Sequence, residues 1–325
     1  MAVCESDCTI NETKNQEDDY AVYNRSLAVT LAHYASAVYI SDLMGLFNWT
    51  CSRCIKTNGF VMIDLIVDVD NCLQAFVGFA KSLNAVIIAF RGTQLKSIQN
   101  WMTDLNWCLS DLDYPDSSEA KVHHGFYSAY HDTSMRPAVV KAVRKANLMY
   151  GANINVFVTG HSMGGAMASF CALDLKMTGL AKNIQVCTYG MPRIGNAEFA
   201  TFYSQHVPDT IRVTSERDIV PHLPPNYPTH YRNYRHFPRE VWIHKVENDC
   251  SVNIIETVCD ESGEDPCCSR SLIRYSLFNH MYYYGLSMAD HHPKVCHIVI
   301  DPGLDNFTTS DSYGNFIFSR TPTNI

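Results

Sequence analysis

Residues 155–170 decide the fold, and they read Asn155-Val-Phe-Val-Thr-Gly-His-Ser162-Met-Gly-Gly-Ala-Met-Ala-Ser-Phe170. An apolar run leads into the pentapeptide Gly-His-Ser-Met-Gly, and an almost wholly apolar run leaves it. A G-x-S-x-G sequence between a strand and a helix is typical of a serine that projects from a strained turn. The backbone N–H of Met163 and the dipole of the helix favour negative charge at that point. We therefore predict that Ser162 is a nucleophile and that the neighbouring His161 points away.

The rest of the chain alternates strand and helix patterns around this stretch. Apolar runs predict strands at 60–69, 73–79, 84–90, 154–159, 184–189 and 210–215. Apolar residues at helical spacing predict helices at 26–46, 135–150, 163–177 and 195–206. The alternation predicts an α/β fold, with a mainly parallel central sheet flanked by helices in a single domain at 23–290. Residues 1–22 read as a flexible polar arm, and 291–325 as a tail of uncertain structure in which 295–300 fit an edge strand.

The composition excludes several classes of function. A formal charge of −8 argues against nucleic-acid binding, and 46% hydrophobic residues fit a globular protein with a large core. No apolar run reaches about eighteen residues, so we expect no transmembrane segment. Thirteen cysteines favour disulfides and the secretory pathway, and glycosylation sequons stand at Asn11, Asn24, Asn48 and Asn306. The first residues lack the apolar core of a signal peptide, so a cytoplasmic location is the alternative.

The acid partner of Ser162 should follow a later strand, because this architecture orders its catalytic residues as serine, acid and histidine. Residues 210–225 supply a β-branched strand followed by Glu216, Asp218 and a proline-rich segment. Asp218 is the better candidate, since Glu216 fits the loop edge and Asp209 precedes the strand. We therefore predict that Asp218 orients the catalytic histidine and stabilises its protonated ring.

The histidine that accepts the Ser162 proton should come later still. His222 lies too close to Asp218 in sequence, and its proline-flanked context looks structural. His280 is far enough along the chain to return to the carboxyl edge of the sheet, so we favour it as the general base. The other histidines beyond Asp218 stay open as alternatives: His230, His236, His244, His291, His292 and His297.

Residues 85–107 predict the remaining parts of the site. The strand at 84–90 runs into Arg-Gly-Thr93, and we expect the N–H groups of Thr93 and Met163 to form an oxyanion hole. The next segment has an amphipathic helical pattern, which suits a lid that turns outward at a lipid surface. An ordinary surface helix packed on the core is the alternative. The apolar face of this helix carries Leu95, Ile98, Trp101, Met102 and Leu105.

Several motifs follow one another in a fixed order. They are Phe90-Arg-Gly-Thr93, Ser97-x-x-Asn-Trp-x-x-Asp-Leu105, Val122-His-His-Gly-Phe126, the Ser162 pentapeptide, Tyr189-Gly-Met-Pro-Arg-Ile-Gly-Asn196 and Arg217-Asp-Ile-Val-Pro-His-Leu-Pro224. Over roughly residues 25–290 the chain resembles the class 3, or fungal-lipase-like, lipases, and it looks closest to their plant members. The resemblance implies an α/β-hydrolase fold, with a short helical lid at about 94–107. It places Ser162, Asp218 and His280 at the triad positions, and Thr93 and Met163 at the oxyanion hole.

The same resemblance implies hydrolysis of carboxylic esters without a metal or an organic cofactor. An apolar lid would be wasted on small soluble esters, so the leading interpretation is a triacylglycerol lipase. It would act as a monomer on lipid esters at a lipid–water interface, with peripheral membrane contact. Phospholipase A1, galactolipase and feruloyl esterase activities stay open on the same fold, and a lipase-like signalling protein with an idle triad is the alternative of a different class.

Two further expectations come from the resemblance. Similar proteins imply disulfides between Cys51 and Cys54, and between Cys259 and either Cys267 or Cys268. One departure from the family pattern is Asn279, which stands before His280 where aspartate is frequent.

Overall fold

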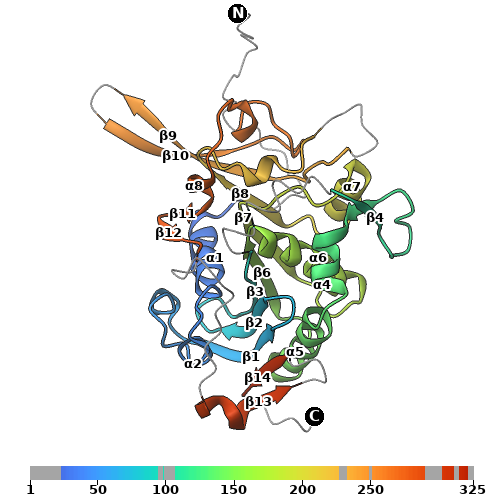
Figure 1. Ribbon diagram of the computed structural model, residues 1–325, viewed down its shortest axis with the longest axis vertical. Helices are drawn as coiled ribbons and strands as arrows, with labels where there is room; N and C mark the ends of the chain where they lie inside the picture. The colour runs from blue at the N-terminus through green and yellow to red at the C-terminus, as the bar shows by residue number, and fades with distance from the viewer. Residues whose placement is uncertain are drawn as a thin grey trace, which may run out of the picture.

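The computed structural model describes residues 23–93, 98, 107–226, 233–248, 251–289, 302–310 and 315–320 (Figure 1). The strands are β1 (Phe60–Asp68), β2 (Leu73–Ala80), β3 (Ala85–Phe90), β4 (Leu109–Asp111), β5 (Lys121–His123), β6 (Asn155–His161), β7 (Ile184–Tyr189), β8 (Thr210–Ser215), β9 (Glu240–Asn248), β10 (Ser251–Val258), β11 (Tyr282–Tyr283), β12 (Leu286–Ser287), β13 (Thr308–Ser310) and β14 (Phe316–Ser319). The helices are α1 (Arg25–Ala37), α2 (Leu43–Phe47), α4 (His124–His131), α5 (Met135–Tyr150), α6 (Met163–Met177), α7 (Ala197–His206) and α8 (Leu277–His280), with short 3₁₀ turns at Ile55–Thr57, Val220–His222, Ser269–Ser271 and Pro302–Phe307.

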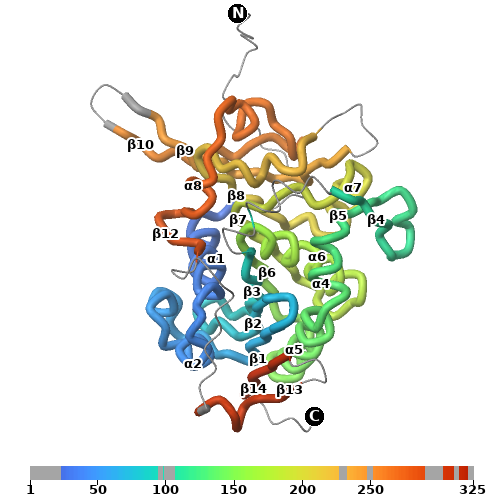
Figure 2. The backbone as a smooth tube through the Cα atoms, viewed as in Figure 1, coloured from blue at the N-terminus to red at the C-terminus, as the bar shows by residue number. Residues whose placement is uncertain are grey.

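A ten-stranded mixed sheet organises these elements, in the order β10-β9-β8-β7-β6-β3-β2-β1-β14-β13. The strands from β3 to β9 in this order run parallel to their neighbours, and antiparallel strands extend the sheet on both sides. Strand β9 continues into a hairpin with β10 that projects from the body of the molecule (Figure 2). The carboxyl ends of β3, β6, β7 and β8 lie along one edge, so the loops that follow them are brought together there.

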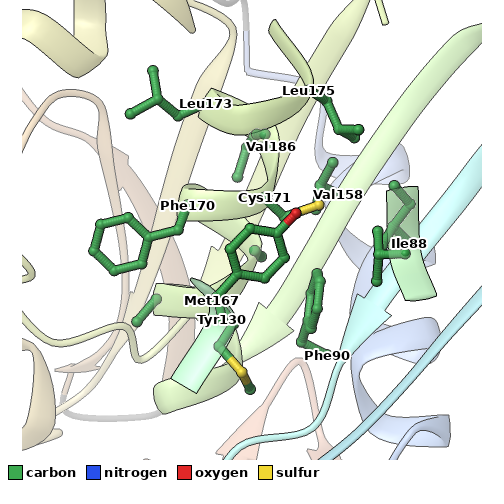
Figure 3. Close-up of a cluster of buried hydrophobic side chains, with 14 of the residues drawn as sticks. Ile88, Phe90, Tyr130, Val158, Met167, Phe170, Cys171, Leu173, Leu175 and Val186 are labelled. Carbon is green, nitrogen blue, oxygen red and sulfur yellow. The ribbon is translucent and has the colours of Figure 1, made fainter. Parts of the chain in front are cut away.

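Helices cover both faces of the sheet. Helices α4, α5, α6 and α7 pack through one hydrophobic cluster, and α1 and α2 pack on the opposite face through a second. Figure 3 shows part of the first cluster, where the Tyr130 ring of α4 lies among side chains of α6 and meets the Phe90 ring at a centroid distance of 5.9 Å. Every residue of α6 from Gly164 to Leu175 is buried. Because α6 is packed on all sides, its first residues are held rigidly.

The runs predicted at 60–69, 73–79, 84–90, 154–159, 184–189 and 210–215 correspond to β1, β2, β3, β6, β7 and β8, and the expected α/β architecture is confirmed. The single helix predicted at 26–46 is wrong. The chain forms α1 and α2 instead, because the Asp42 side chain accepts the Gly45 N–H at 3.0 Å and starts a new helix. The edge strand predicted at 295–300 lies outside the described residues.

Residues beyond 300 contribute to the sheet. Strand β14 pairs antiparallel with β1, so that Asp64 lies opposite Ser319 and Val67 opposite Phe316. The side chain of Phe318 is fully buried in the cluster that contains α1 and α2. The described part of the tail is therefore packed against the same sheet as the strands near the start of the chain.

Candidate active site

Ser162 occupies the turn between β6 and α6. Its φ and ψ angles are 58° and −129°, a region that residues other than glycine rarely adopt and that is often found at functional sites. The Ser162 N–H donates to the Tyr189 carbonyl at 2.9 Å, which ties the turn to the end of β7. A Cβ atom at Gly164 would lie 2.3 Å from the Phe90 oxygen, so only glycine lets α6 start this close to β3. Ser162 therefore stands at the first turn of a rigid helix, beside three strand ends.

His280 and Asp218 form a buried pair. The Nδ1 atom of His280 lies 2.8 Å from Oδ2 of Asp218, and the two residues are 0% and 2% exposed. Asp218 also accepts a hydrogen bond from the Tyr283 hydroxyl and, on Oδ1, one from the Val220 N–H at 2.9 Å. Among the described residues, His280 Nε2 has no hydrogen-bond partner. The far side of the ring thus keeps a nitrogen that can exchange a proton.

Two short connections bring α8 to Asp218. Ser276 caps α8 through its side chain, which accepts the Phe278 N–H at 3.2 Å. Its own N–H donates to the Arg217 carbonyl at 2.7 Å, and Ser276 forms a parallel bridge with Asp218. A helix of one turn after this bridge carries His280 back over the carboxylate.

Gly190, directly after β7, marks the point where the predicted residues converge. A Cβ atom there would lie 2.8 Å from Asp218 Oδ2 and 2.9 Å from His280 Cε1. The preceding residue, Tyr189, holds the Ser162 N–H. The structure thus brings Ser162, Asp218 and His280 to the end of the same central strand.

The expected oxyanion residues, Thr93 and Met163, contact each other beside Ser162. The Thr93 hydroxyl is 3.2 Å from the Met163 sulfur, so the loop after β3 reaches the first residue of α6. A Cβ atom at Gly92 would lie 3.0 Å from Ser162 Cβ. Of the expected lid residues, Ile98 is helical and 2% exposed. Leu95, Trp101, Met102 and Leu105 lie outside the described residues.

Known proteins are similar to this chain in sequence and fold. Residues 87–227 match the family described as Lipase (class 3). The chain is 34% identical to the lipase of Rhizomucor miehei over 74% of this chain and 62% of that protein, and 29% identical to secreted mono- and diacylglycerol lipase 1 of Fusarium solani over 71% and 65%. A solved structure of Rhizomucor miehei triacylglyceride lipase superposes with a TM-score of 0.69 at 30% identity, covering 82% of this chain and 97% of that chain.

The chain belongs to the class 3 lipase family. The expected α/β-hydrolase fold is confirmed by this membership and by the sheet order. Another family structure, of a triacylglycerol lipase whose catalytic centre is a serine protease triad, is 31% identical with a TM-score of 0.67. This class 3 lipase spans 62 to 65% of the length of the two curated relatives. Its placement among plant members stays a prediction.

Three residues near the site were not predicted. The Tyr283 hydroxyl donates a hydrogen bond to Asp218. Burial raises the pKa of this phenol well above its usual value, so the hydroxyl stays a donor. His161 was expected to point away, but its ring lies 4.3 Å from the His280 ring. Tyr39 hydrogen-bonds His161 Nδ1 at 2.8 Å. No spacing rule marks these residues, because their contacts join segments far apart in the sequence.

Arg193 anchors the segment that follows Asp218. Its guanidinium donates to the carbonyls of His222 and Pro224 at 2.7 and 2.9 Å, and it forms a two-bond ion pair with Glu264 at 2.7 and 2.8 Å. Both charged side chains are 5% exposed. Burial alone raises the pKa of the Glu264 carboxyl, but the hydrogen bonds and charge of Arg193 outweigh burial and hold this pKa below its usual value. Arg193 thereby joins the loop behind Asp218 to the loop that carries Glu264.

We expect Arg193→Met to lower the free energy of unfolding by about 3–5 kcal/mol, because Glu264 would stay buried without its cation. Urea unfolding at pH 7 measures the loss. Arg25→Met, which breaks the exposed ion pair with Glu256, is the control and should cost at most about 1 kcal/mol. In the wild type the contribution of the Arg193–Glu264 pair to the free energy of unfolding is complete above the pKa of an unfolded glutamate, about 4.3. This contribution is lost as the pH falls from there through the lowered pKa of the folded state. Equal losses for the two variants at pH 7 would contradict the prediction.

Disulfides close two loops of the described chain. Cys51–Cys54 and Cys259–Cys268 are both formed, so the first implied pairing is confirmed and the second is settled in favour of Cys268. Cys267 is also disulfide-bonded. Within the described ranges, one set of side chains, Cys259, Asp265 and Cys268, lies close enough to hold a metal ion, but its two sulfurs are joined to each other. In the same ranges, no helix has both the length and the hydropathy to cross a bilayer.

Proposed function

We propose that this class 3 lipase is a serine carboxylic-ester hydrolase that acts on acyl glycerides. Ser162, Asp218 and His280 would form its triad. The observation that carries the proposal is the buried pair of His280 and Asp218 at the end of β7, beside the Ser162 turn. The names of the relatives, which include a triacylglyceride lipase and a mono- and diacylglycerol lipase, support glycerides as the substrate class.

Acylation would begin with attack of Ser162 Oγ on the ester carbonyl carbon. His280 Nε2 accepts the hydroxyl proton, and Asp218 stabilises the resulting imidazolium through Nδ1. Negative charge then develops on the carbonyl oxygen, which the N–H groups of Met163 and Thr93 would bind. The tetrahedral intermediate collapses when His280 gives its proton to the leaving alcohol, which leaves the acyl group on Ser162.

Deacylation repeats these steps with water as the nucleophile. His280 Nε2 accepts a proton from the water, whose oxygen attacks the acyl carbon, and returns this proton to Ser162 Oγ as the fatty acid leaves. Asp218 keeps its orientation in both half-reactions because Tyr283 and Val220 hold its two oxygens. The ring of His280 therefore needs no rearrangement between acylation and deacylation.

Acyl-chain length tests the substrate class. We expect kcat/KM to rise along a series of esters from acetyl to decanoyl, because each fully buried methylene adds about 0.8 kcal/mol, or about fourfold. We also expect the rate on a triacylglycerol to rise when the substrate passes its solubility limit and forms an interface. Rates on nitrophenyl esters and on a triolein emulsion measure both effects. Activity that is flat along the series and unchanged at the interface would exclude a lipase.

A fluorophosphonate probe separates an enzyme from a lipase-like protein with an idle triad. The probe reacts with an activated serine and should label the wild-type chain at a single site. Labelling that is absent from Ser162→Ala supports the enzyme. A wild-type chain that is never labelled supports a binding role.

We further propose that the chain is secreted and acts as a monomer at lipid surfaces, with the segment at 94–107 as its lid. The two disulfides and the relatives that are named as secreted lipases support an extracellular location. The burial of Ile98, the one described residue of the expected apolar face, is consistent with an apolar side chain that turns inward.

A further inference from the structure

A buried chain of hydrogen bonds links the loop after β3 to the backbone of His280. The Gly92 N–H lies 3.0 Å from Tyr39 Oη, which lies 2.8 Å from His161 Nδ1. On the other side of the ring, His161 Nε2 lies 2.8 Å from the His280 carbonyl oxygen. Tyr39 and His161 are 3% and 1% exposed. This series of hydrogen bonds therefore connects the catalytic histidine with the oxyanion loop, which is the segment after β3 that carries Gly92 and Thr93. None of its members needs to touch substrate.

The direction of each hydrogen bond follows from donor capacity. The His280 carbonyl can only accept, so His161 Nε2 must carry a proton. In a neutral ring Nδ1 is then an acceptor, and the Tyr39 hydroxyl must donate to it. The hydroxyl oxygen in turn accepts the Gly92 N–H. Each of the three hydrogen bonds then has one donor and one acceptor, so a single arrangement of protons satisfies Gly92, Tyr39, His161 and His280.

The surroundings keep this arrangement. Burial, and then the charge of the neighbouring His280, lower the pKa of His161 well below its usual value, so the ring stays neutral. Burial raises the pKa of Tyr39, which keeps its proton. A charged His161 ring only 4.3 Å from His280 would oppose the imidazolium that forms during catalysis.

The close packing around Gly92 holds the oxyanion loop in place. A Cβ atom at Gly92 would lie 2.3 Å from Tyr39 Oη, 2.4 Å from the His161 carbonyl oxygen and 3.0 Å from Ser162 Cβ. The oxyanion loop therefore packs directly against the turn that carries Ser162. The Tyr39 hydroxyl holds the backbone of this loop through the Gly92 N–H. A shift of this loop would move Thr93 relative to Ser162.

We propose that Tyr39 and His161 are positioning residues for ester hydrolysis, which set the oxyanion loop and the backbone of His280 at a fixed separation around Ser162. The inference rests on the proposed function. A displacement of about 1 Å in such a site can cost about 10²-fold in rate, so loss of the link should act on kcat and leave KM nearly unchanged. A side chain that only stabilises the core would change the unfolding temperature and leave kcat per active site unchanged.

Tyr39→Phe tests the link because it removes one hydroxyl and leaves the ring in place. We expect kcat per labelled site to fall about 10- to 100-fold, with KM within about twofold of the wild type, and the rate of fluorophosphonate labelling to fall in parallel. Tyr203→Phe is the matched control, since Tyr203 is also fully buried and its hydroxyl lies 3.2 Å from the Thr210 hydroxyl. We expect this control to keep the wild-type kcat.

A pair of substitutions at His161 provides the second measurement. His161→Gln keeps one acceptor and one donor, whereas His161→Leu keeps neither. We expect the glutamine variant to retain at least about tenfold more kcat than the leucine variant at equal site concentration. Site concentration is taken from the labelled fraction, so a partly unfolded preparation does not distort the comparison.

The outcomes separate this inference from the proposed function. An active, labelled wild type in which Tyr39→Phe matches Tyr203→Phe, or in which the two His161 variants are equal, overturns the inference and leaves the proposed function standing. A wild type that is neither labelled nor active overturns both. A loss of kcat in Tyr39→Phe, together with a higher kcat in His161→Gln than in His161→Leu, supports the link.

Discussion

Ser162→Ala is expected to lower kcat for ester hydrolysis by about 10⁵–10⁶-fold while the protein stays folded. In the proposed mechanism the serine hydroxyl oxygen forms the acyl-enzyme, and alanine leaves no nucleophile at the start of α6. Any activity that remains would come from the oxyanion hole and from binding alone. Hydrolysis of a short nitrophenyl ester, followed together with circular dichroism, measures the loss.

Ser169→Ala provides the control on the same helix. Ser169 is fully buried, and its hydroxyl donates to the Gly165 carbonyl at 3.0 Å. This substitution removes a serine hydroxyl from α6 at a distance from the turn, so we expect wild-type kcat. Full activity in Ser162→Ala would remove the serine from the mechanism and leave the strained geometry of the turn without a catalytic role.

Asp218→Asn is expected to lower kcat by about 10⁴-fold with little change in KM. Asparagine fits the same space, but its amide can offer a donor to His280 Nδ1 and so favour the ring tautomer that carries its proton on Nε2. That tautomer cannot accept the Ser162 proton. Steady-state kinetics at pH 8 measure the effect.

Asp209→Asn is the matched control for the acid. Asp209 is exposed and precedes β8, whereas Asp218 follows the strand and is buried. We expect the Asp209 variant to retain wild-type kinetics. If the two variants lose equal activity, or if Asp218→Asn is as active as the wild type, a different group orients His280.

Local periodicity predicts the centre of this fold well. The buried strands β6, β7 and β8 are short apolar runs next to helices, and such patterns depend on neighbouring residues alone. The break between α1 and α2 was missed because Asp42 caps a helix within a stretch whose apolar spacing continues. The pairing of β14 with β1 could not be read from either strand, since register between distant segments depends on packing that no local pattern records.

The residues of the site also differ in whether the local sequence predicts them. Ser162 and Asp218 were predicted from the residues around them, because Ser162 directly follows one recognisable strand and Asp218 stands three residues after another. His280 had several histidine competitors, and only the Ser276 bridge explains why this one returns to Asp218. Tyr283, Tyr39 and His161 act through hydrogen bonds across the fold, and a tyrosine or histidine in an apolar run is usually a packing residue.

The position of β14 also bears on the order in which the molecule can assemble. Asp64 emerges early from the ribosome, but its partner Ser319 is made only after almost every other described residue. Until then, the outer side of β1 has no partner from the tail, and exposed strand edges are sites at which nascent chains associate wrongly. Because β14 is made late, the outer edge of β1 stays unpaired by the tail during synthesis. Correct folding then depends on rapid completion of the chain, or on a chaperone that covers this edge.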